Sequence, residues 1–81
     1  MKKRYADGLI PGNNSKARQD VALQMKAARL DRSMTQQELA EITGTKKSNI
    51  SRMESGNYNP SLDFMVKVAG GMGKQLSIKL E

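Results

Sequence analysis

The sequence predicts a mainly α fold, in which a bundle of four helices is followed by a short C-terminal β-strand. Apolar residues recur at three- and four-residue steps over most of the chain, which is the spacing of amphipathic helices. Serine or threonine precedes these segments and glycine ends most of them. Only the last residues alternate apolar with polar side chains. At 81 residues the chain can bury a single core, so we expect one domain.

The first helix is predicted to run from about Lys16 to Arg32, with Ser15 as its N-cap. Its inner face is predicted to carry Ala17, Val21, Ala22, Met25 and Ala28. The preceding residues 1–14 contain the first proline and a Gly-Asn-Asn cluster, which are typical of loops. We therefore expect a flexible N-terminal arm there.

The second helix is predicted at 36–43. Thr35 and Glu38 have the spacing of a capping box, in which each side chain bonds the other residue's backbone amide. Gly44 is placed to end the helix in the left-handed conformation.

The third and fourth helices follow after short turns. The third is predicted at 46–55, capped by Thr45 and closed by Gly56, and the fourth is capped by Ser61. The inner stripe of the fourth helix is predicted to be Leu62, Met65, Val68, Ala69 and Met72. We expect methionine to fill the core at Met25, Met34, Met53, Met65 and Met72.

The tail, 74–80, has the two-residue period of a strand, with Leu76, Ile78 and Leu80 on one side. A lone strand needs a partner for its backbone groups and its apolar face. We expect it to pair with the same segment of a second chain, although the arm around Tyr5 to Ile10 is a competing partner. The expected parts are then the arm, a helical domain at 15–73 and a dimerisation strand at 74–81.

Composition excludes several classes of function. There are 14 Lys and Arg against 8 Asp and Glu, which gives a net charge of +6, and there is no His or Cys. Zinc fingers, disulfides and thiol or imidazole catalysis are thereby excluded, so we expect no enzyme, no cofactor and no metal site. The positive charge favours a polyanionic partner over a merely solvated basic surface. No apolar run is long enough to span a membrane, and we expect a cytoplasmic protein.

The helices predicted at 36–43 and 46–55, joined by a tight turn, have the arrangement of a helix-turn-helix. On a helical wheel, Ile50 and Met53 of the third helix face inward. Ser48, Ser51 and Arg52 cluster on the opposite side with Lys47 at their edge, and Lys46 and Lys47 stand at the N-terminus of the helix. The N-terminal end of such a helix enters the major groove of DNA.

Several spaced segments resemble the Xre/Cro/cI repressor-type helix-turn-helix family. They are Met34–Ala40, Gly44, Ile50–Gly56 and Asn59–Leu62. The resemblance covers roughly Val21 to Met72 and implies a compact bundle of four or five helices that binds operator DNA as a dimer.

The resemblance also implies roles for single residues. The base-reading candidates are Lys46, Lys47, Ser48 and Arg52, with a phosphate contact as the alternative for Arg52 and a solvated helix start as the alternative for the lysines. The phosphate candidates are Thr35, Gln36, Ser51, Ser55 and Asn57. Arg29 and Glu54 are expected to form a structural ion pair between the first helix and the end of the third. Thr43 departs from the family, which more often has a small apolar residue there.

The strand-like ending resembles the antitoxin branch of the family, which includes the HigA- and HipB-like proteins. It implies a protein that neutralises a toxin and represses the shared type II toxin–antitoxin operon. We therefore expect a homodimeric repressor on a palindromic operator, with a protein toxin as second partner. The alternatives are an antitoxin for which DNA binding is secondary, and a non-specific RNA- or nucleoid-binding protein. For the arm, Lys2 to Arg4 could be a solvated terminus, a minor-groove arm or a toxin contact, and Leu9 and Ile10 could pack on the dimer or on a partner.

Overall fold

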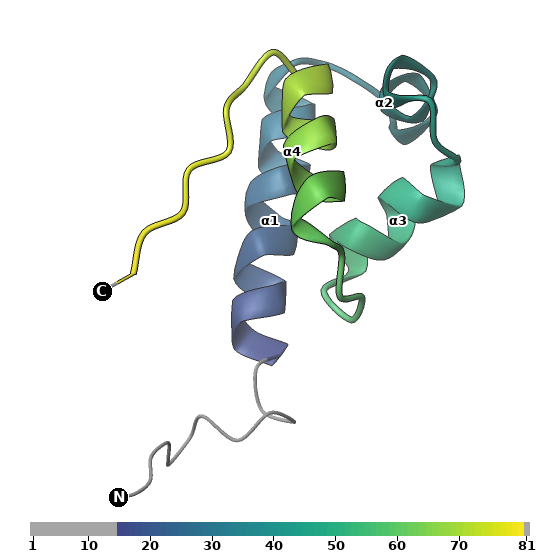
Figure 1. The fold of residues 1–81 in the computed structure, drawn as a ribbon. Helices are drawn as coiled ribbons and strands as arrows, with labels where there is room; N and C mark the ends of the chain where they lie inside the picture. Colours follow the sequence, from purple (N-terminus) through teal and green to yellow (C-terminus); the bar gives the residue numbers. More distant parts are fainter. Residues whose placement is uncertain (1–14, 81) are drawn as a thin grey trace, which may run out of the picture.

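A computed structural model describes residues 15–80 of the chain, and the arm expected at 1–14 lies outside them. The helices are α1 (Ser15–Asp31), α2 (Gln36–Thr43), α3 (Lys47–Ser55) and α4 (Leu62–Gly71). Figure 1 shows α1 and α4 running in the same direction, with α2 and α3 packed to one side of them. These are the four helices that the sequence predicts. None of the helices within 15–80 is both long and apolar enough to cross a membrane.

Local capping explains where these helices begin and end. The Thr35 hydroxyl accepts from the Glu38 N–H at 3.0 Å, and the Glu38 carboxylate accepts from the Thr35 N–H at 2.8 Å, which confirms the capping box of α2. The Ser61 hydroxyl accepts from the Phe64 N–H at 3.1 Å and caps α4 as predicted. Gly44 has the expected left-handed backbone, with φ 70°.

The cap of α3 differs from the prediction. Lys46, not Thr45, is its N-cap residue, and no side chain caps the helix. The Thr45 N–H instead bonds the Ala40 carbonyl at 2.9 Å, so that Thr45 still belongs to the closing turn of α2. Its hydroxyl accepts from Asn49 Nδ2 at 2.8 Å.

The core lies between the four helices. Its fully buried side chains are Leu39, Ile50, Met53 and Val68. Met25 and Met72 are also buried, and Met34 and Met65 pack against the core, which confirms the predicted role of these methionines. The prediction for Leu62 is wrong, because this side chain is 53% exposed. Leu62 lies in the first turn of α4 at the edge of the inner stripe, where little covers it.

The predicted C-terminal strand is absent from residues 15–80. The tail (74–80) turns at Gly73, with φ 70°, and runs back beside α1 without a β-ladder (Figure 1). Lys74 Nζ lies 3.4 Å from Asp31 Oδ2, and Leu76 is half-buried, whereas Ile78 and Leu80 are 65% and 94% exposed. Residues 15–80 offer no strand edge, so a ladder would need a second chain or the segment Tyr5 to Ile10, which lies outside the described residues. The pairing of two tails therefore stays a prediction.

Candidate nucleic-acid interface

The turn between α2 and α3 sets the position of the candidate recognition helix. The Thr45 N–H bonds the Ala40 carbonyl at 2.9 Å, and the Gly44 N–H bonds the Glu41 carbonyl at 3.3 Å. These two bonds are the Schellman pattern, which closes a helix when the residue after its last turn is left-handed. The chain therefore leaves α2 in a fixed direction and enters α3 after the three residues 44–46.

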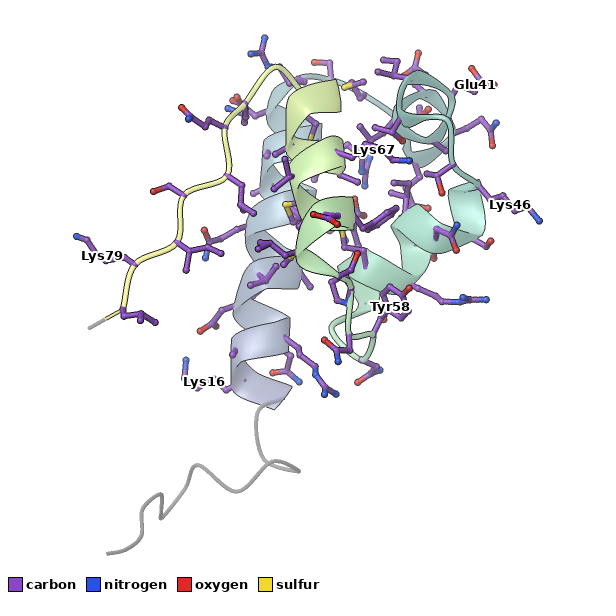
Figure 2. All side chains as sticks on the ribbon, viewed as in Figure 1. Lys16, Glu41, Lys46, Tyr58, Lys67 and Lys79 are labelled. Carbon is purple, nitrogen blue, oxygen red and sulfur yellow. The ribbon has the colours of Figure 1, made fainter. Side chains whose placement is uncertain are left out.

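Helix α3 has one buried and one exposed side. Ile50 and Met53 are 0% and 2% exposed and fix the helix on the core. The opposite side consists of exposed residues from the cap to the last turn: Lys46, Lys47, Ser48, Ser51 and Arg52. We call these five residues the α3 strip. In Figure 2, Lys46 projects from the start of α3 at the edge of the molecule.

The start of α3 is electrostatically suited to an anion. Its first turn contains no acidic residue, and no side chain caps its amides. The first amides of a helix lack intrahelical acceptors and lie at the positive end of the helix dipole. Two lysines at the same place add to that potential, so DNA phosphate or base acceptors would be attracted there.

A buried ion pair ties α3 to α1. Arg29 Nε donates to Glu54 Oε2 at 2.7 Å and Arg29 Nη2 donates to Glu54 Oε1 at 3.0 Å. The two side chains are only 8% and 3% exposed. Hydrogen bonding to Glu54 raises the pKa of Arg29 above its ordinary value, despite the opposing effect of burial, so the arginine stays charged. The structure thus brings together the two residues that the family resemblance pairs.

Two further bonds extend this pair to the start of α2. Arg29 Nη1 donates to the Met34 carbonyl at 2.7 Å, and Gln36 Nε2 donates to Glu54 Oε1 at 3.0 Å. The Gln36 link was not foreseen from the sequence, because its partner is 18 residues away and no local pattern marks it. One carboxylate therefore fixes the relative positions of α1, α2 and α3.

Three of the phosphate candidates, Thr35, Gln36 and Ser55, already make side-chain hydrogen bonds within the protein. Thr35 caps α2, and Gln36 donates one of its two amide hydrogens to Glu54. The Ser55 hydroxyl donates to the Arg52 carbonyl at 2.6 Å and accepts from the Asn57 N–H at 3.2 Å. Ser55 thus shapes the turn after α3, whereas Ser51 and Asn57 are exposed. Among residues 15–80, no group of three acidic side chains is arranged to hold a metal ion.

Comparison with known proteins agrees with this geometry. A family described as helix-turn-helix matches residues 25–78, which is more than half of the chain. The chain belongs to the helix-turn-helix family. The match begins within α1 and extends through the first part of the tail, so it includes α2, α3, α4 and the part of α1 that carries Arg29.

Three proteins are similar to parts of this chain. An immunity repressor protein of Bacillus phage phi105 is 40% identical over 57 residues, which are 70% of this chain and 40% of that protein. An uncharacterized HTH-type transcriptional regulator of Haemophilus influenzae is 38% identical over 45 residues, or 56% of this chain and 46% of the relative. Antitoxin HicB 1 of Photorhabdus laumondii is 37% identical over 57 residues, which are 70% of this chain and 37% of that protein. The chain thus spans less than half the length of each of these three relatives.

Proposed function

We propose that the protein is a sequence-specific transcriptional repressor that binds a palindromic operator as a homodimer. The observation that carries the proposal is the α3 strip, which is exposed, basic at its N-terminal end and held on the core by Ile50 and Met53. In helix-turn-helix proteins the corresponding surface lies in the major groove. The similarity to a phage immunity repressor supports the same role. Such a repressor would act in the cytoplasm, where its operator lies.

Selection of bound duplexes from random DNA tests this proposal. We expect an enriched pseudo-palindrome whose half-sites lie about one helical turn apart, because a two-fold dimer sets that spacing. Absence of any enriched motif at moderate salt would contradict specific binding and would favour the non-specific alternative.

Arg52 is the residue in which we expect base reading to be clearest. Its guanidinium can donate two bonds to guanine, so Arg52→Ala should cost about 1–3 kcal/mol and relax preference at one base pair of each half-site. The matched control is Lys79→Ala, which removes one charge on the side of the molecule opposite Lys46 (Figure 2). An equal loss on all sequences would instead indicate a phosphate contact.

Gln36 should behave differently. Gln36→Ala removes a candidate phosphate donor, so we expect weaker binding to all duplexes nearly equally. Because Gln36 also donates to Glu54, the thermal unfolding of the variant must be measured beside its affinity. A change in base preference would show that Gln36 reads sequence.

The second candidate function is that of an antitoxin in a type II toxin–antitoxin operon. It is supported by the similarity to a protein named antitoxin HicB 1, and by the exposed apolar side chains Ile78 and Leu80 in the tail. The HigA- or HipB-like branch remains part of this proposal. Co-expression with the product of the adjacent gene tests it: an inactive complex of the two proteins is expected, and no binding between them would contradict it.

A further inference from the structure

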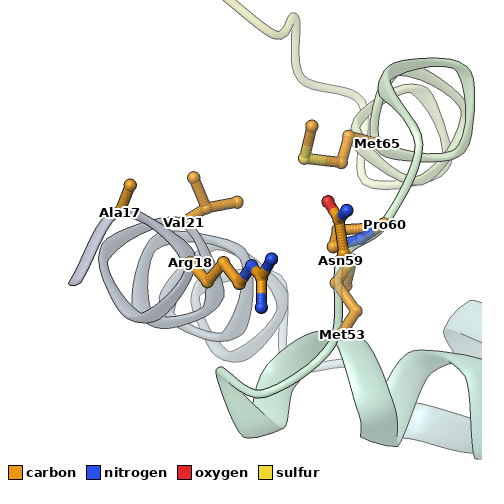
Figure 3. Close-up of a pocket in the computed structure, with 7 residues that line it drawn as sticks. All are labelled: Ala17, Arg18, Val21, Met53, Asn59, Pro60 and Met65. Carbon is orange, nitrogen blue, oxygen red and sulfur yellow. The ribbon is translucent and has the colours of Figure 1, made fainter. Parts of the chain in front are cut away.

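A hollow of about 230 Å³ lies at the lower end of α1 in Figure 1. Its apolar lining comes from α1, α3, the loop before α4, and α4 itself: Ala17, Val21, Met53, Pro60 and Met65. Figure 3 shows Val21 and Met65 on opposite sides of the hollow, with Arg18 extending from α1 towards Asn59. The site is therefore an apolar depression with one cationic side chain. No function described above uses it.

We propose that Leu9 and Ile10 of the same chain occupy this hollow. The N-terminal segment joins the described structure beside the hollow. Helix α1 begins at Ser15, and Ala17 and Arg18 in its first turn already line the hollow. Ile10 precedes Ser15 by five residues, which can span up to about 17 Å, whereas Val21 lies only about 9 Å along the helix from Ser15. The segment thus reaches the whole hollow.

The side chains of the segment complement the lining of the hollow. Leu9 and Ile10 are adjacent large aliphatic residues within an otherwise mostly polar segment, and Asp7 is the single acidic residue among residues 1–14. With the aliphatic pair against Val21 and Met65, Asp7 would be placed to approach Arg18. A cavity of about 150 Å³ already holds a benzene ring, so the volume suits aliphatic side chains.

The covalent link to α1 also favours docking of the segment in the hollow. A short linker gives its attached group an effective concentration in the millimolar range, so a modest apolar contact suffices to keep the hollow filled by its own chain. Occupation would cover Met53 on the inner side of α3 and would contact Pro60, which follows the turn after α3.

Paramagnetic relaxation tests the proposal directly in the full-length chain. The sequence contains no cysteine, so Ala6→Cys gives a single site for a nitroxide label. We expect selective broadening of the NMR signals of Val21 and Met65, and none at Ile42, which lies beside the opposite end of α4 near Gly71. Uniformly weak broadening would overturn the proposal.

Matched arm variants identify the docking side chains. Leu9→Ser together with Ile10→Ser should abolish the broadening, whereas Lys3→Ser together with Arg4→Ser should leave it unchanged. Broadening that persists in the first variant would overturn the assignment to Leu9 and Ile10. The hollow could instead hold the arm of a second copy of the protein. To test this, nitroxide-labelled protein without ¹⁵N is mixed with ¹⁵N protein that carries no nitroxide. Broadening in this mixture arises between molecules, so it would place a second copy in the hollow and overturn docking within one chain.

Discussion

At the scale of single residues, the Arg29–Glu54 pair is a buried ion pair that links two helices. Both side chains are almost fully removed from water, yet the carboxylate accepts from Arg29 and Gln36, and the guanidinium also donates to the Met34 carbonyl. Removal of one member of a buried pair leaves the other charge desolvated and without its partner. The pair therefore makes the orientation of α3 depend on α1.

We expect either Arg29→Ala or Glu54→Ala to lower the free energy of unfolding by on the order of 3 kcal/mol. The double variant should cost clearly less than the sum of the two, as measured by chemical denaturation. The control is the exposed pair of Lys16 and Asp20, whose side chains are 85% and 53% exposed, and Lys16→Ala should change stability by less than about 0.5 kcal/mol. Additive single effects would show that the two buried charges are not coupled.

At the scale of elements, the contact between α2 and α4 depends on Thr43 and Gly71. A Cβ placed on Gly71 would lie 2.5 Å from Thr43 Cγ2, whereas a Cβ on Gly70 would meet nothing within 4 Å. The Thr43 hydroxyl donates to the Leu39 carbonyl at 2.8 Å, which holds the side chain in one rotamer and keeps its methyl group against α4. The family departure at Thr43 is thus accommodated by a glycine in the facing helix.

Two alanine substitutions in α4 should therefore have opposite effects. Gly70→Ala should raise the free energy of unfolding by about 0.5–1 kcal/mol, because alanine is the better helix former. Gly71→Ala should lower it by about 1–3 kcal/mol through overpacking. Thr43→Ser keeps the hydroxyl and removes the methyl, so in that background Gly71→Ala should become neutral or stabilising. Destabilisation that is equal in both backgrounds would exclude Thr43 as the cause.

The elements themselves differ in how far the sequence predicts them. The caps of α2 and α4 are predictable because Thr35 and Ser61 each bond an amide three residues ahead. The sequence predicts Thr45 as the N-cap of α3, but its backbone N–H bonds the Ala40 carbonyl and closes α2. Lys46 is the N-cap of α3 instead. The exposed α3 strip follows from helical periodicity, but the link from Gln36 to Glu54 depends on the tertiary packing of α2 against α3. Sequence pattern thus predicts which faces of the helices are buried, and of the bonds between helices it anticipates only the Arg29–Glu54 pair, through the family resemblance.

At the scale of the whole molecule, the tail contacts its own chain and is also the segment through which we propose that two chains assemble. Its first half packs on its own chain, because Lys74 lies near Asp31 and Leu76 is half-buried. Its second half leaves Ile78 and Leu80 exposed. Deletion of 74–81 would therefore remove contacts within the monomer as well as the proposed dimer contact. Substitution of the two exposed side chains separates these effects.

If the proposed dimer forms through the tails, Ile78→Asn together with Leu80→Asn should convert it into a monomer. The stability of the single chain should change little, because substitutions at exposed positions usually stay within about 0.5 kcal/mol each. Lys79→Asn, a polar substitution between these two residues in the sequence, is the control and should leave the proposed dimer intact. Sedimentation equilibrium gives the mass of each variant, and binding to a full palindrome and to one half-site gives the cooperativity.

The monomeric variant should lose affinity for the palindrome and keep its affinity for the half-site, because one tail ribbon would orient both α3 helices about a common two-fold axis. A variant that stays dimeric with unchanged operator affinity would place the dimer interface elsewhere on the molecule.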